Sequence, residues 1–148
     1  MGRGEPILSP PLRLPTGWVA FGPIEGREVA VLPSEVGGDG GGRPAGVITI
    51  TSLRGDDRPS AEVATDVVRA LAGIETDLLV LDEGTVRCRG NVPAHRVLTA
   101  HTERGRGITT EVWVVAGAAP AALCAAVDTA RYAELGPALH RALRSYRS

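Results

Sequence analysis

The sequence predicts an α+β fold in which an antiparallel β-sheet carries helices packed on it. Residues 78–127 contain successive stretches rich in apolar and β-branched side chains, separated by short polar turns. Strands joined by such short links favour antiparallel pairing. A helical pattern begins at Ser60, before these strands, and a second helix is expected near the C-terminal end. Strands in a row with helices inserted and appended indicate a layered sandwich.

Glycine and proline predict how the chain is organised. Residues 1–11 are expected to form a flexible N-terminal arm, and residues 12–148 a single domain. The sequence Leu-Pro-Thr-Gly-Trp at residues 14–18 predicts a strand, a turn and an aromatic anchor. Gly37–Gly42 contains five glycines and one aspartate, a composition typical of a flexible loop. Because Pro44 and a strand follow, rather than a helix N-terminus, we do not expect this segment to bind phosphate.

Two strands and a helix are expected between the arm and the main run of strands. Residues 29–32 predict a short strand, and residues 47–53 predict another from the β-branched sequence VITITSL. Ser60 follows Pro59 and is suited to the N-cap of a helix. Apolar residues then recur at the spacing of one helical face. They are Val63, Val67, Ala70, Leu71 and Ile74.

The second half of the chain predicts four strands and a closing helix. The strands are expected near residues 78–89, 94–103, 108–116 and 121–127. Gly90-Asn91 and residues 104–107 supply turn residues between them. Proline breaks a helix interior but is favourable at the first helical position. Because of Pro137, the last helix is therefore expected to begin near Gly136.

Composition excludes several classes of function. A net charge of −1 gives no basis for strong, sequence-independent binding to nucleic acid. All 16 basic residues are arginines, so no lysine is available for a Schiff base or a phosphate-binding loop. No run of about 18 apolar residues predicts a membrane-spanning helix. The first residues also lack the apolar core of a secretory signal, so we expect a cytoplasmic protein.

No cofactor, metal or catalytic site is expected from the side chains that could supply one. His95, His101 and Glu103 would share one face of a strand. The two histidines would lie about 20 Å apart, too far to hold one metal ion, but they remain candidates for lining a ligand cavity. Cys88 and Cys124 are too few for a disulfide framework. We expect two buried thiols, and their redox state stays open.

An arginine-rich helix face and the scarce aromatic residues are the candidate partner-binding features. Arg141, Arg144 and Arg147 would lie on or near the polar side of the last helix. There they either meet an acidic partner or stay solvated. Trp18 is one of five aromatic residues, and it either anchors the core or contributes to an interface.

Several short motifs occur in a characteristic order between residues 12 and 147. They are LPTGW at 14–18, VITI at 47–50, the helix after Pro59-Ser60, GNVPAHR at 90–96, TEVWVV at 110–115 and YAELGPAL at 132–139. In this order the chain resembles the PsbP/Mog-like superfamily, especially its bacterial LpqN-type members. The resemblance implies an α/β/α sandwich with an antiparallel sheet of six or seven strands. It also implies a mostly non-enzymatic role, and it defines no catalytic residue.

The expected function is therefore a non-enzymatic accessory or adaptor module that binds another protein, linked to a bacterial secretion or envelope pathway. Lipoprotein-like relatives carry a signal and a lipid-attached cysteine that this sequence lacks, which favours the cytoplasm. The alternative is a small-molecule binding protein or enzyme of a specialised metabolic pathway, with a cavity between sheet and helices that contains His95 or His101. A self-assembling subunit is a third interpretation, because the sequence leaves the oligomeric state open.

Overall fold

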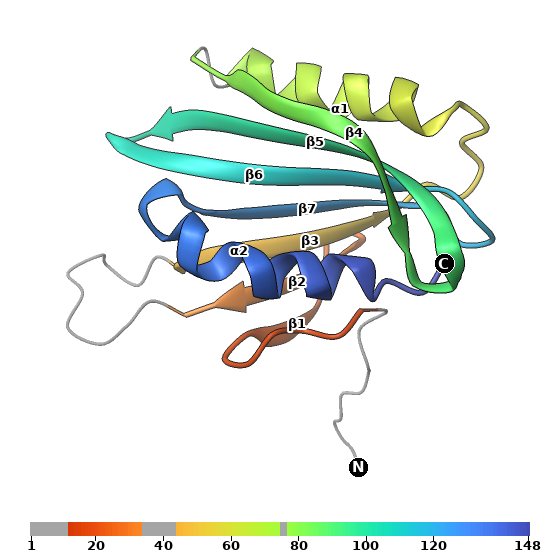
Figure 1. Cartoon of the computed structure of the whole chain (residues 1–148), viewed down its shortest axis with the longest axis horizontal. Coiled ribbons are helices and arrows are strands. Elements are labelled where there is room, and N and C mark those ends of the chain that lie inside the picture. Colours follow the sequence, from red (N-terminus) through yellow and green to blue (C-terminus); the bar gives the residue numbers. More distant parts are fainter. Residues whose placement is uncertain (1–11, 34–43, 75–76) are drawn as a thin grey trace.

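In the part of the chain that the structure describes, seven strands form one antiparallel sheet in the order β1-β2-β3-β7-β6-β5-β4. The computed structural model describes residues 12–33, 44–74 and 77–148 (Figure 1). The predicted arm and the glycine loop Gly37–Gly42 lie outside the described residues. The strands are β1 (Val19–Ile24), β2 (Arg27–Leu32), β3 (Gly46–Ser52), β4 (Leu79–Cys88), β5 (Val92–Glu103), β6 (Arg106–Val115) and β7 (Ala121–Asp128).

Two helices cover opposite faces of the sheet, so the predicted α+β sandwich is confirmed (Figure 1). Helix α1 (Ser60–Ile74) packs on β5 and β6, and helix α2 (Thr129–Arg144) packs on β6 and β7. Side chains alternate between the faces along β6. Val112 and Val114 belong to the core under α1, whereas Trp113 and Val115 belong to the core under α2.

The predicted start of α2 near Gly136 is wrong, because the helix begins at Thr129 and contains Pro137 in its interior. Proline cannot donate a hydrogen bond to the carbonyl one turn earlier, which belongs to Ala133. Both Pro137 and Ala133 are exposed, so water can satisfy that carbonyl. The early turns are also stabilised by packing, since Tyr132 and Leu135 lie against the core.

The strand predicted at the start of residues 14–18 is displaced. Trp18 donates its backbone N–H to the Pro15 carbonyl at 3.2 Å, which closes the predicted turn, and Gly17 adopts a φ of 92°. Such a positive φ favours glycine. Strand β1 then begins at Val19, after the turn rather than before it. The turn and the aromatic anchor are as predicted, and the turn places Trp18 beside α2.

Candidate functional site

A large hollow on the described surface runs beside α2, and we call it the α2 groove. Its volume is about 1010 Å³. One wall is a face of α2, and the other is the chain before β1 together with the end of β2. The described lining residues are Arg13, Leu14, Pro15, Thr16, Trp18, Leu32, Arg89, Arg131, Glu134, Leu135, Ala138, Arg141, Ala142, Arg144 and Ser145.

Positive charge dominates this groove. Among the described residues that line it, five are arginines and a single glutamate is the only acid. That glutamate, Glu134, is already paired with Arg131, whose Nη2 lies 2.9 Å from Glu134 Oε2. The side chains of Arg13, Arg89 and Arg141 make no ion pair with any residue in the described ranges. The groove therefore carries unbalanced positive charge on a protein whose net charge is −1.

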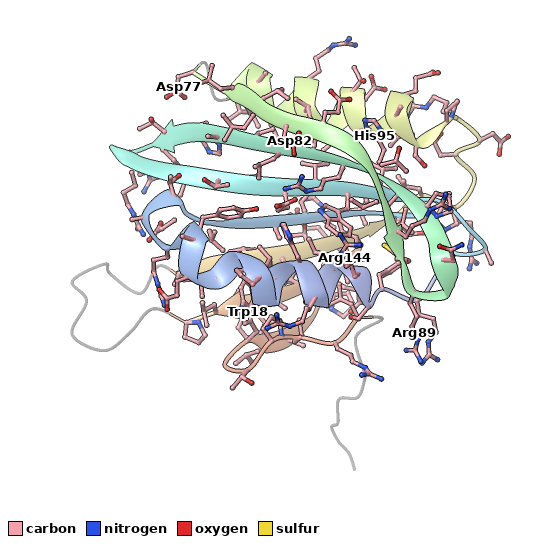
Figure 2. All side chains as sticks on the ribbon, in the orientation of Figure 1. Trp18, Asp77, Asp82, Arg89, His95 and Arg144 are labelled. Carbon is pink, nitrogen blue, oxygen red and sulfur yellow. The ribbon has the colours of Figure 1, made fainter. Side chains whose placement is uncertain are left out.

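The unbalanced arginines gather at the C-terminal end of α2. The Arg13 backbone N–H donates to Ser145 Oγ at 2.7 Å, which ties the incoming chain to this end of the helix. Arg89 begins the single 3-10 turn Arg89–Asn91, directly after Cys88. The Cys88 thiol donates to the Leu143 carbonyl at 3.6 Å, and this contact brings the turn to the same end of the helix. Figure 2 shows Arg89 and Arg144 toward that end.

The other end of the groove is apolar. Trp18 lies against Gly46 at the start of β3. A Cβ atom added to Gly46 would come within 2.7 Å of Trp18 Cη2 and 3.0 Å of Val127 Cγ1, so both side chains lie close to this glycine. Val127 is next to the last residue of β7, directly before α2. Trp18 therefore lies near the N-terminal half of α2, away from Arg89 (Figure 2). Leu32 and Leu135 line the groove with it.

A buried polar cluster lies beneath α2, centred on Glu111, a side chain with no solvent exposure. Arg96 donates from Nε to Glu111 Oε1 at 2.7 Å and from Nη2 to Oε2 at 2.9 Å. Trp113 Nε1 donates to Oε1 at 2.9 Å, and the Tyr132 hydroxyl donates to Oε2. His140 Nε2 lies 2.5 Å from Oε2. Glu111 thus joins β5, β6 and α2 through one carboxylate.

Hydrogen bonding determines the ionisation of this cluster. Burial alone raises the pKa of Glu111, but its hydrogen bonds from Arg96, Tyr132, Trp113 and His140 outweigh that effect and lower the pKa to about 2. Burial, together with the Glu111 charge, raises the pKa of Tyr132 to about 12. At neutral pH the cluster therefore contains a carboxylate and a neutral phenol. We assign it the role of holding α2, and thereby one wall of the groove, on the sheet.

The cluster also contacts the groove through Trp113. The guanidinium of Arg144 lies over the Trp113 ring, with Cζ 5.7 Å from the ring centroid, a cation–π geometry. Arg144 also donates from Nη1 to the Arg87 carbonyl at 3.3 Å. Arg144 is therefore the groove arginine that is positioned by the buried core.

Three of the four predicted partner-binding residues line the groove. Trp18, Arg141 and Arg144 line it, whereas Arg147 is exposed but lies outside the lining set. Neither candidate cavity histidine lines it. His95 Nε2 lies 2.6 Å from Glu83 Oε2 at the β4 side of the sheet (Figure 2). His101 is buried, with Nε2 3.8 Å from Glu103 Oε1.

Both cysteines are free thiols. Cys88 is buried and Cys124 is half-buried. Burial raises the pKa of each thiol to about 11, so neither is an activated nucleophile at neutral pH. Among the described residues, no group of three or more His, Cys, Asp or Glu side chains is arranged to hold a metal ion. Neither α1 nor α2 combines the length and apolarity that a bilayer-crossing helix needs.

Three residues of the groove and the buried cluster were not predicted from the sequence: Arg13, Arg89 and Glu111. The signal for Glu111 was present, because it is a lone carboxylate in the apolar strand β6 and shares a face with Trp113. No local signal marks Arg13 or Arg89, because each reaches the groove through contacts with the distant end of α2.

Comparisons with known proteins identify the fold. No protein-family model matches the sequence, and no curated protein matches it significantly. Solved structures do match. Ran-binding protein Mog1p of Saccharomyces cerevisiae is 14% identical with a TM-score of 0.62, covering 91% of this chain and 85% of Mog1p. The chain has a Mog-like fold. A protein of unknown function from Pseudomonas aeruginosa is 13% identical with a TM-score of 0.57, covering 88% of this chain and 81% of that chain.

LpqN of Mycobacterium tuberculosis, which is involved in cell envelope biogenesis, also matches this chain. It is 15% identical with a TM-score of 0.56, and the match covers 90% of this chain and 79% of LpqN. The predicted resemblance to Mog-like and LpqN-type proteins is therefore confirmed at the level of the fold. At these identities, function has to be argued from the groove itself.

Proposed function

We propose that this Mog-like chain is a non-catalytic accessory module that binds another protein through the α2 groove. The observation that carries the proposal is the excess of arginine over acid in that groove. Arginine is enriched in protein interfaces and forms strong hydrogen bonds with carboxylates. An acidic segment of a partner would therefore be complementary to this surface.

The dimensions of the groove suit a peptide segment. The lining residues of α2 extend from Arg131 to Arg144, about 20 Å along the helix axis. An extended chain covers that length with about six residues. Two proteins of the same fold support a role of this kind: Mog1p is a Ran-binding protein, and LpqN is involved in cell envelope biogenesis. We extend this to an adaptor role in an envelope or secretion pathway.

Site-specific photo-crosslinking tests the proposal. A photoreactive amino acid is placed at Ala138, which lines the groove, and as a matched control at Ala72, which is exposed on α1. Crosslinking in extract of the native host should join a protein to position 138 only, and mass spectrometry should locate the crosslink in an acidic segment. Arg13→Glu combined with Arg141→Glu should abolish that product. Equal crosslinking at both positions, or no effect of charge reversal, would overturn the proposal.

A further inference from the structure

The unpaired arginines and the apolar side chains of the α2 groove lie toward different ends. Their separation indicates which kind of ligand group each end would bind. Arg13, Arg89, Arg141 and Arg144 lie at the C-terminal end of α2, where no acidic residue lines the groove within the described ranges. Trp18 and Leu135 lie toward the N-terminal half. There the fifth arginine is neutralised by Glu134.

The distance between the two ends follows from helix geometry. Leu135 and Arg144 both line the groove from α2, and at 1.5 Å per residue they are separated by about 13 Å along the helix axis. An extended peptide covers this distance with about four residues. A side chain seated on the apolar end and one seated on the arginine end would therefore be about four positions apart in the ligand.

We propose that the α2 groove recognises a partner segment with an apolar anchor about four residues from a cluster of acidic side chains. The anchor packs between Trp18 and Leu135, and the acidic cluster binds the unbalanced arginines. This inference rests on the proposed function and adds to it the chemistry and the spacing of the ligand. It also assigns the recognition of acidic side chains to one end of the groove, so that arginines of equal charge contribute unequally.

Fluorescence anisotropy with synthetic peptides tests this inference. The reference peptides carry one leucine and a Glu-Asp-Glu cluster centred four residues away, made in both chain directions, with glycine and serine elsewhere. At least one should bind, and moving the leucine next to the cluster or replacing it by serine should weaken binding at least fivefold. A peptide with lysines in place of the acids should not bind.

Single-arginine variants test the contribution of each end to binding, and each variant removes one positive charge. Arg141→Gln and Arg89→Gln should each weaken binding at least fivefold, because both remove an unpaired guanidinium from the charged end. Arg131→Gln removes an arginine already paired with Glu134, and Arg147→Gln removes one outside the groove. Each of these should change binding by less than twofold. All four side chains lie outside the buried core, and circular dichroism verifies that the variants fold.

Failure of this inference is distinguishable from failure of the proposed function. Two results would show that the groove does not bind the anchor and the acidic cluster at separate ends, although it still binds acidic segments. Either Arg131→Gln weakens binding as much as Arg141→Gln, or the spacing between leucine and cluster has no effect. If none of the peptides binds while the crosslink at Ala138 forms, the proposed anchor and spacing are wrong although the groove still binds a protein. Light scattering tests whether a second copy of this chain occupies the groove instead. A dimer that Arg13→Glu and Arg141→Glu dissociate would show that a second copy fills the groove, and would overturn the inference.

Discussion

Arg96 and Glu111 form a bidentate ion pair on the face of the sheet that α2 covers. The two hydrogen bonds are 2.7 and 2.9 Å long, and the side chains are 14% and 0% exposed. The pair crosses from β5 to β6, and Arg96 also reaches Asp82 on β4 with Nη1 3.0 Å from Asp82 Oδ2. Charge that is buried this deeply has to be matched, because an unpaired buried carboxylate is costly.

Replacing Arg96 by methionine should therefore destabilise the fold. Glu111 keeps its donors on Trp113, Tyr132 and His140 but loses its positive partner, so the free energy of unfolding should fall by about 3 kcal/mol. Urea denaturation followed by circular dichroism measures this. The control is Arg58→Met, which removes surface ion pairs with Asp56 and Asp66 and should cost about 1 kcal/mol or less. Equal losses in the two variants would contradict the prediction.

The pKa of Glu111 predicts how stability depends on pH. Its folded-state pKa, about 2, is below its ordinary value of 4.5. The contribution of this carboxylate to stability is therefore complete above about pH 5 and is lost as the pH falls toward 2. At about 1.4 kcal/mol per pKa unit, about 2 kcal/mol should disappear between pH 5 and pH 3.

The comparison with Glu111→Gln isolates this effect. Because the variant lacks the titrating group, the difference in unfolding free energy between wild type and variant should shrink by about that amount over the same pH range. Urea titrations at pH 6, 5, 4 and 3 measure the difference. If it stays constant with pH, Glu111 does not have a lowered pKa in the folded protein.

Trp113→Ala should be among the most destabilising single changes. The Trp113 side chain is fully buried between β6 and α2, so truncation should cost about 3–5 kcal/mol. Phe21→Ala provides the contrast, because Phe21 is 48% exposed on β1 and its loss should cost less than about 1 kcal/mol. Thermal and urea denaturation compare the two. A loss below about 1 kcal/mol for Trp113→Ala would show that the ring is not part of the core.

Gly46→Ala should disturb the apolar end of the α2 groove. The added methyl group would lie 2.7 Å from Trp18 Cη2, so the indole has to move. We expect a shift in Trp18 fluorescence, measured in a Trp113→Phe background, together with lower stability. Gly73→Ala is the matched control. Gly73 lies in α1 with no atom within 4 Å of the added Cβ, and alanine should stabilise the helix by up to about 1 kcal/mol. An unchanged Trp18 spectrum in Gly46→Ala would contradict the close contact.

The parts of the fold that local signals describe were predictable from the sequence. Helix α1 begins at Ser60, within one residue of the predicted N-cap position, because Pro59, Ser60 and the apolar spacing all indicate this start. The start of α2 was not predictable, because the preference of Pro137 for a first turn is overridden by the packing of Tyr132 and Leu135 on the core. Tertiary contacts of this kind have no local sequence pattern.

The candidate site was predictable only in part for the same reason. Arg141 and Arg144 could be placed on one side of the last helix from periodicity. The Arg13 backbone N–H contacts Ser145, and Arg89 is brought to the same place by its neighbour Cys88, whose thiol contacts Leu143. Likewise, Glu111 stands out in its strand, but its pairing with Arg96 depends on a register in which Arg96 lies opposite Trp113. A single sequence does not reveal such registers.

The position of β7 has a consequence for the order of folding during synthesis. Strands β1–β3 and β4–β6 each pair with their sequence neighbours, but the two groups are joined only through β7, which pairs with β3 on one side and β6 on the other. A nascent chain that ends before Ala121 therefore holds two separate three-stranded units, and the edges at β3 and β6 that β7 later covers are unpaired. Because β7 follows both groups in the chain, these two edges stay open to pairing with other chains until β7 has been synthesised.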